Sequence, residues 1–241
     1  MSYFLILAFI FFIGSIVGWV IELIFRRFFS RTNPKRRWIN PGFLIGPYLP
    51  LYGISLCILF LLAQINIIFI HNEYVEQLVL FTIMALVVTF IEYLAGIIFI
   101  KGMNIKLWDY TEEQCNIQGI ICLKFSFFWA ILSAIYYFLI HPYILESLYW
   151  VSNHLSFSFI MGFFYGVFVI DVCYSLKIMV HIRKFAYDNE IIVKYELLKE
   201  NIRKRNEELI GKKKFIFAMH LGREEYLKHL KHYKEELNKK L

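Results

Sequence analysis

Three long apolar stretches of the sequence each contain one carboxylate, the kind of side chain that can bind a cation or a proton inside a membrane. These residues are Glu22, Glu92 and Asp171. Placing an Asp in hydrocarbon costs about 2.5 to 3.5 kcal/mol on insertion scales, so such groups usually face a bundle interior or a water-filled cavity. We therefore predict that the three acids line one shared polar cavity in the inner half of the bilayer.

Each acid also has a structural interpretation, which the sequence leaves open. Arg26 follows Glu22 by four residues, a spacing at which two side chains on one helix face form an ion pair. For Glu92 and Asp171 the alternative is a hydrogen bond between helices, with the carboxyl group protonated. Only the positions of their partners distinguish a shared cavity from three unrelated contacts.

The segment from residue 40 to residue 53 contains three prolines and three glycines. Proline lacks a backbone donor and clashes with the preceding turn, so this segment does not form a regular helix. In a membrane, the freed carbonyl groups need partners in protein or in a water-lined cavity, and interrupted helices often mark transporter sites. We expect Asn40, Pro47 and Tyr52 to contribute to the cavity. A kinked helix entry, with proline tolerated in its first turn, is the alternative.

A second motif lies between the third and fourth apolar runs. Its characteristic residues are Trp108, Asp109, Tyr110 and Asn116. A capping box that begins at Asp109 or Thr111 predicts a short helix here. Trp108 and Tyr110 also suit an aromatic belt at the membrane surface.

The composition places these residues in a membrane protein. Of the 241 residues, 59% are hydrophobic and 19% aromatic, and the mean hydropathy of +0.56 exceeds that of an ordinary soluble domain. We predict an all-α, polytopic membrane helix bundle of about five transmembrane helices, because five apolar runs approach or exceed the roughly 20 residues that cross a bilayer. The runs cover about residues 3–25, 43–70, 75–100, 120–140 and 155–180.

The distribution of Lys and Arg predicts the orientation. Basic residues follow the first and third apolar runs, whereas residues 71–76 and 141–154 contain no Lys or Arg. Because positive loops stay in the cytoplasm, we expect a multi-pass protein of the cell (plasma) membrane with its N-terminus outside and its C-terminus cytoplasmic. The first run has no preceding charge and no small-residue cleavage site, so we interpret it as a retained anchor.

The sequence changes character near residue 180, which predicts a transmembrane bundle over 1–180 and a cytoplasmic basic helical tail over 181–241. The tail contains 16 basic and 10 acidic residues. We expect it to contact anionic lipid, at roughly 1 kcal/mol per Lys or Arg near the surface, rather than nucleic acid. His229 and His232 are expected at the surface. Two amphipathic helices are predicted, with apolar positions Ile191, Tyr195, Leu198, Ile202 and Leu209, then Tyr226, Leu230, Tyr233 and Leu237.

The four cysteines indicate no metal centre, because none belongs to a CxxC pair. Two of them, Cys57 and Cys173, lie in apolar runs where Cys behaves as a small hydrophobic residue. We therefore expect no disulfide framework, no zinc site and no cofactor.

The motifs together resemble the bacterial "putative ABC-transporter permease, type IV" family over about residues 14–142. The sequence departs from the family pattern at Pro41, where Arg is expected, at Ile100, where a second acid often follows Glu92, and at Thr111, where Ser is usual. The resemblance implies a permease. Since the sequence has no phosphate-binding loop, any ATPase would be another chain. The matching residues are Gly18, Trp19, Glu22, Asn40, Gly42, Phe43, Gly46, Pro47, Pro50, Tyr52, Gly53, Glu92, Tyr93, Gly96, Trp108, Asp109, Tyr110, Asn116, Gly119, Cys122, Leu123, Ser126, Trp129 and Pro142.

Three functions remain open at this point. The first is a transport subunit, in which the acids and the broken helix form the cavity and a separate ATP-binding subunit supplies energy. The second is a membrane-embedded enzyme that acts on lipid, with Glu92 or Asp171 as the general base. The third is a membrane scaffold whose tail recruits other proteins.

Overall fold

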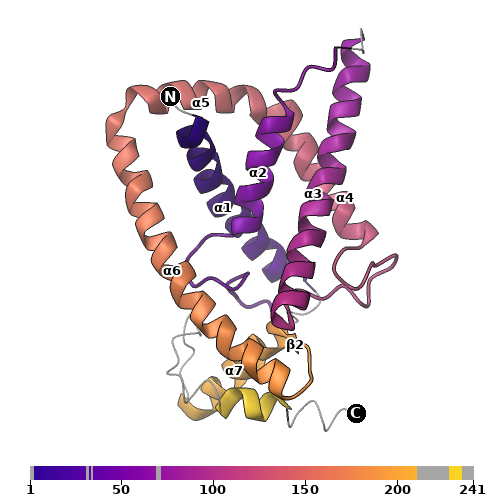
Figure 1. Ribbon diagram of the computed structural model, residues 1–241, viewed down its shortest axis with the longest axis vertical. Coiled ribbons are helices and arrows are strands. Elements are labelled where there is room, and N and C mark those ends of the chain that lie inside the picture. The colour runs from indigo at the N-terminus through magenta and orange to yellow at the C-terminus, as the bar shows by residue number, and fades with distance from the viewer. Residues whose placement is uncertain (1–2, 31–32, 34, 69–71, 211–227, 235–241) are drawn as a thin grey trace. The chain divides into compact units, whose positions relative to one another are not determined.

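Most of the described chain is helical in the computed structural model, which describes residues 3–30, 33, 35–68, 72–210 and 228–234 (Figure 1). The predicted all-α class is therefore confirmed. The named strands of the described residues are β1 (Ile105–Lys106) and β2 (Val193–Lys194), which pair in parallel. The helices are α1 (Tyr3–Phe28), α2 (Pro50–Leu62), α3 (Glu73–Met103), α4 (Leu123–Ala134), the π-helix η1 (Ile135–Ile140), α5 (His141–Asn153), α6 (Leu155–Asp188) and α7 (Tyr195–Ile210).

In the described part of the chain, four helical runs are long and apolar enough to cross a membrane. They are Tyr3–Phe28, Glu73–Met103, Leu123–Val151 and Ser156–Asp188, with hydropathies between 1.7 and 2.7. At 1.5 Å per residue, even the shortest run, of 26 residues, exceeds the roughly 30 Å hydrocarbon core. The chain is a multi-pass membrane protein.

The second predicted span is shorter than the sequence indicates. Instead of a helix over 43–70, the structure has the 13-residue helix α2, which covers roughly 20 Å at 1.5 Å per residue. Proline explains the late start, because Pro47 lies in a non-helical segment and Pro50 occupies the first turn of α2. Proline is tolerated in that position, where no intrahelical donor is needed.

The described residues divide into two compact units. The first unit contains Met1–Ile21, Pro47–Ala95 and Tyr110–Ile170, and the second contains Glu22–Gly46, Gly96–Asp109 and Asp171–Leu241. Helix α6 continues through residue 180 to Asp188, and the predicted domain boundary at that residue stays a prediction.

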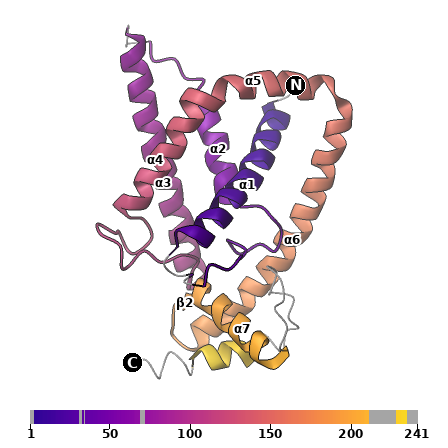
Figure 2. The same cartoon turned by 180° about the vertical axis from the view of Figure 1, so that it is seen from behind.

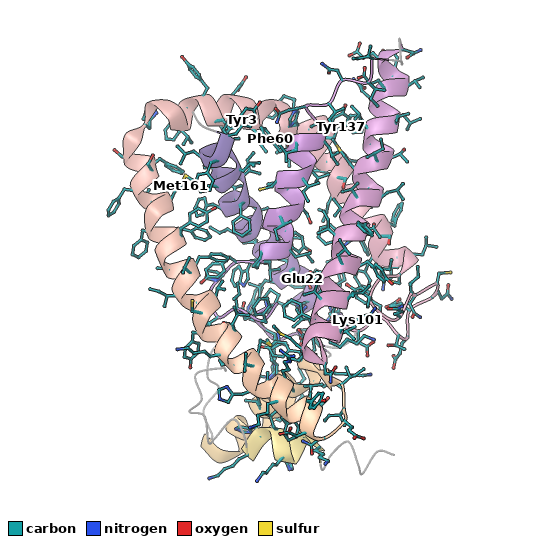
Figure 3. All side chains as sticks on the ribbon, in the orientation of Figure 1. Tyr3, Glu22, Phe60, Lys101, Tyr137 and Met161 are labelled. Carbon is teal, nitrogen blue, oxygen red and sulfur yellow. The ribbon has the colours of Figure 1, made fainter. Side chains whose placement is uncertain are left out.

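The first unit has one apolar core, to which α1, α2, α3, α4, η1, α5 and α6 all contribute. Met84 and Val88 bury one face of α3, and Trp129 belongs to the same cluster. Figure 3 labels three further members of this core: Phe60 at the end of α2, Tyr137 on η1 and Met161 on α6. The other fully buried members are Phe9, Ile10, Leu59, Tyr136, Leu148 and Val151.

Helices α1 and α2 lie side by side in both views (Figures 1 and 2), in close contact at two glycines of α1. A Cβ atom at Gly14 would lie 3.0 Å from Leu56, and one at Gly18 would overlap the ring of Tyr52. The N–H of Leu49 also donates to the carbonyl of Ser15 (2.9 Å). Small residues four apart thus allow a second helix to approach, as their spacing predicts.

The π-helix η1 comes directly before a proline. Pro142 lacks an N–H, and its ring would clash with the carbonyl four residues earlier in a regular helix. The wider turn accommodates it, since the N–H of His141 donates to the carbonyl of Tyr136, five residues back. The Tyr136 hydroxyl also lies 2.9 Å from Nδ1 of His141, which links the two ends of this turn.

The second unit has its own core around the two short strands. Ile105 pairs with Val193, and both are fully buried beside Met179 and Ile182 of α6. The amphipathic helix predicted in the first part of the tail is present as α7, whose Tyr195, Leu198 and Ile202 enter the same core.

The final described segment corrects the expectation for one histidine. His229 is buried, at 5% exposure, rather than at the surface, because Leu230 and Tyr233 pack into the second core beside it. His232 is half-buried. Of the positions predicted for the last helix, Tyr226 and Leu237 lie outside the described residues, as does the side chain of Leu209 in α7.

We expect Gly18→Ala to destabilise the protein by about 1–3 kcal/mol, because the added methyl group overlaps the Tyr52 ring. Thermal unfolding of the purified protein in detergent measures this effect. Gly162→Ala on α6 is the matched control, since nothing lies within 4 Å of the Cβ position there. Equal melting temperatures for the two variants would contradict the close contact.

Candidate functional site

The carboxylate of Asp171 binds the backbone of the broken segment. Its Oδ1 accepts the N–H of Ile45 (3.1 Å), and its Oδ2 accepts the N–H of Gly46 (2.7 Å). The Ser175 hydroxyl, one turn further along α6, donates to Oδ1 (2.9 Å). Asp171 is only 9% exposed. The side chain therefore supplies acceptors to amides that have no helical partner.

Asn40 organises the carbonyl groups of the same segment. Its side-chain amide donates to the carbonyls of Leu44 (2.9 Å) and Ile45 (3.0 Å). Gly42 has a φ of 74°, in the left-handed region that glycine enters without steric cost. Asn40 and Asp171 are thus brought together on one segment: Asn40 binds its carbonyls and Asp171 binds its amides.

A lysine from α7 binds the start of this segment. Nζ of Lys199 donates to the carbonyls of Asn40 and Gly42, each at 3.1 Å, and lies 3.0 Å from Glu196. The Lys199 side chain is 12% exposed. Burial lowers its pKa, and the attraction of Glu196 opposes that shift only in part. Lys199 was not among the site residues predicted from the sequence. The signal available for it was its place next to Leu198 in the predicted amphipathic helix.

Glu196 connects α7 to the end of α1. Arg26 lies 2.8 Å from Glu22 and 2.7 Å from Glu196, so the ion pair that the sequence allowed at Glu22 forms. Burial alone would raise the pKa of Glu196, but the charges of Arg26 and Lys199 outweigh burial and lower it. The four side chains carry two positive and two negative charges, so the cluster is neutral.

Glu92 belongs to the first unit, and its partner comes from the loop motif. The Tyr110 hydroxyl donates to Oε1 of Glu92 (3.2 Å), and the Tyr110 ring stacks on Phe125 at 4.3 Å between centroids. Glu92 is 3% exposed. Because Glu22 and Asp171 belong to the second unit, the cavity shared by all three acids stays a prediction.

The rest of the loop motif has structural contacts. Asp109 pairs with Lys106 (2.6 Å) and Lys194 (2.7 Å) in the second unit. In the first unit, the Asn116 amide donates to the carbonyls of Thr111 and Glu113, and its Oδ1 accepts the N–H of Gly119. Trp108 is half-buried.

The short helix expected from the capping box does not form. The described residues 107–121 make turns and one bridge between Ile117 and Ile121. Cys115, Gln118 and Gly119 have positive φ values of 52°, 55° and 64°. These values are incompatible with a right-handed helix, so the capping-box prediction is wrong.

Pro47 and Tyr52, the remaining predicted site residues, belong to the first unit. Pro47 is exposed and lies in the non-helical segment. Tyr52 packs against Trp129 of α4, with 4.8 Å between the ring centroids. A role for either residue in a cavity stays a prediction.

Most of the chain matches a known protein family. A family model described as "Putative ABC-transporter type IV" matches residues 9–176, more than half of the 241 residues. The chain belongs to this family. The comparison with curated proteins gives no match, and the comparison with solved structures gives none.

The match range separates the site into two parts. It includes Asn40 and Asp171, together with the segment that they organise. It ends before α7, so Glu196 and Lys199 lie outside the matched residues. In this ABC-transporter-type chain, the ion cluster therefore joins two matched residues of α1, Glu22 and Arg26, to two residues of α7 beyond the match.

We expect Asp171→Asn to lower the free energy of unfolding by about 1–3 kcal/mol, because Asn has one acceptor oxygen for two backbone amides and leaves one unsatisfied. Denaturant unfolding in detergent measures this loss. Asp188→Asn is the control, since Asp188 is exposed on the same helix and loses the same charge. A loss of similar size in both variants would argue against the role of Asp171.

We also expect an acid-sensitive contribution from Glu196. Its folded-state pKa lies below the ordinary value of 4.5, so the ionised side chain stabilises the fold above pH 4.5. That contribution is lost as the pH falls through the folded-state pKa. Glu196→Gln removes this pH-dependent contribution. The variant should therefore lose less stability than the wild type between pH 6 and acid pH, and thermal unfolding at each pH measures the difference. Glu190→Gln, at an exposed position, should behave as the wild type does.

Proposed function

We propose that this chain is the membrane-spanning subunit of an ATP-driven transport system whose ATPase is a separate chain. Membership of an ABC-transporter-type family and four helical runs of membrane-spanning length support the transport role. The sequence itself has no phosphate-binding loop with which to hold ATP. An ATP-binding partner supplies what this chain does not encode.

The observation that carries the proposal is the contact of Asp171 with the broken segment. A carboxylate on a membrane-spanning helix holds two main-chain amides of a non-helical stretch. Non-helical backbone at membrane depth occurs where it is buried in protein or lines a water-filled cavity. Transporter sites are commonly built on such interrupted helices. We assign this segment, with Asn40 and Asp171, to the substrate pathway.

The chemistry of the acids suggests which solutes the pathway favours. Glu22, Glu92 and Asp171 are carboxylates within membrane-spanning runs, where acids commonly mark ion pathways and proton relays. Glu22 pairs with Arg26, whereas Glu92 and Asp171 accept hydrogen bonds from neutral donors. We propose that they favour a cation or a group that carries a proton.

The proposed orientation places the second unit on the side of the membrane where ATP is available. Basic residues lie in the last turn of α1 and after it, between residues 26 and 37, and Lys101 and Lys106 follow the apolar part of α3. Positive loops stay in the cytoplasm. The N-terminus then lies outside, and α7 lies in the cytoplasm, where a partner ATPase can reach it.

Affinity isolation of the full chain from its host's membranes in mild detergent tests this proposal. We expect a chain with a phosphate-binding loop to co-purify and the complex to hydrolyse ATP. The Glu92→Gln/Asp171→Asn double variant should still recover the partner but lower ATP hydrolysis by about tenfold or more, which corresponds to about 1.4 kcal/mol in the barrier.

The matched control is Glu112→Gln/Asp188→Asn, which removes the same two charges from exposed positions. This control should hydrolyse ATP at the rate of the unmodified complex. Isolation without any ATP-binding chain would reject the proposed partner. Equal hydrolysis by the two double variants would reject the role of the acids.

A further inference from the structure

The end of α1 and the segment after it form a basic and aromatic surface in the second unit. The hydrocarbon core takes up about 20 residues of a spanning helix, so the last turn of the 26-residue α1 lies at headgroup level. Arg27 and Phe28 belong to this turn, and Lys35, Arg36 and Trp38 follow it. We call these five residues the Arg27–Trp38 shelf.

Ring contacts hold the two parts of the shelf together. The Arg27 guanidinium lies 4.2 Å from the centroid of the Trp38 ring and 5.5 Å from that of Phe28. Phe28 and Trp38 contact each other edge to face, with 6.4 Å between centroids. Nη1 of Arg36 donates to the carbonyl of Arg27 (3.3 Å). Arg27 and Arg36 are therefore held in place beside an aromatic pair.

A buried asparagine folds this segment back onto α1. The Asn33 amide donates to the carbonyls of Arg26 (3.1 Å) and Arg37 (2.7 Å), and its Oδ1 accepts the N–H of Arg37 (3.1 Å). Asn33 is 4% exposed. Arg36, at the turn, has a φ of 50°. Asn33 thus joins Arg37 to the end of α1 through hydrogen bonds.

The positive charges of the shelf differ from that of Arg26 in their pairing. Arg26 pairs with two carboxylates, whereas no carboxylate in the described part of the chain forms an ion pair with Arg27, Lys35 or Arg36. Lys35 and Arg36 are exposed, and the buried Nε of Arg27 has no hydrogen-bond acceptor among the described residues. The exposed Lys35 and Arg36 are therefore accessible to an anion from outside the chain.

The aromatic side chains are exposed beside these cations. Phe28 is 50% exposed and Trp38 is 44% exposed. Tryptophan is enriched at membrane interfaces, where its apolar ring contacts lipid and its N–H stays near water. Phosphate groups bind guanidinium groups through paired hydrogen bonds. The shelf therefore offers the two kinds of contact that a phospholipid makes. Its aromatic rings can contact the acyl chains, and its cations can bind the phosphate.

We propose that the Arg27–Trp38 shelf binds the headgroup phosphate of an anionic phospholipid. A zwitterionic lipid offers the same phosphate, but its cationic headgroup is repelled by the cations of the shelf. An anionic lipid has no such penalty, and basic segments beside a spanning helix attract it. The residues of this site precede the basic tail in the sequence, and the proposal does not depend on the proposed transport function.

Native mass spectrometry of the delipidated full chain in detergent tests the site. The probes are phosphatidylglycerol and phosphatidylcholine with the same acyl chains. We expect the wild type to prefer phosphatidylglycerol, and Arg27→Gln/Lys35→Gln/Arg36→Gln to weaken its binding by about tenfold or more. Arg36→Gln alone, at an exposed position, should give a smaller loss and serves if the triple variant does not fold.

The charge-matched control, Arg183→Gln/Lys184→Gln/Lys228→Gln, removes three exposed cations from the predicted tail. It should retain binding within about twofold, since it leaves the shelf intact. Equal losses in the two triple variants, or equal affinity of the wild type for both lipids, would overturn the proposal. Displacement of phosphatidylglycerol by millimolar inorganic phosphate would also overturn it, because the site would then bind a free anion.

Discussion

The backbone between Asn40 and Gly46 must find hydrogen-bond partners outside a helix, and much of the second unit is arranged around this requirement. Asp171 accepts two of its amides, while Asn40 and Lys199 donate to its carbonyls. Each partner is itself largely buried. Unsatisfied backbone groups are costly away from water. The polar side chains are therefore needed wherever proline prevents a helix from satisfying the backbone itself.

The use of charged side chains for this purpose creates a second requirement, which α7 meets. Lys199 brings a cation into a buried position, and Glu196 compensates it. Glu196 in turn pairs with Arg26, which also pairs with Glu22. A buried charge is tolerated when it is paired and hydrogen-bonded. The two residues that α7 contributes, Glu196 and Lys199, lie outside the residues matched by the family model, whereas Arg26 and Glu22 lie within them.

Several features of the site were predictable because they depend on local sequence. The ion pair of Glu22 with Arg26 follows from a spacing of four residues. The interrupted helix before Pro50 follows from the geometry of proline. The capping box at Asp109 or Thr111 failed because Asn116 satisfies the backbone of the loop instead, in turns with positive φ. Side chains that bind backbone locally compete with helix formation, and their pattern alone does not decide the outcome.

The sequence by itself determined the membrane class, the family and the position of the helix break, because hydropathy and proline act over a few turns of chain. The tertiary structure decided which groups complete that break. Asp171 is 125 residues from Gly46, and Lys199 is 157 residues from Gly42. No local periodicity connects positions so far apart. Their pairing depends on how α6 and α7 pack within the second unit. That packing brings the buried Asp171 and Lys199 to the backbone of the broken segment.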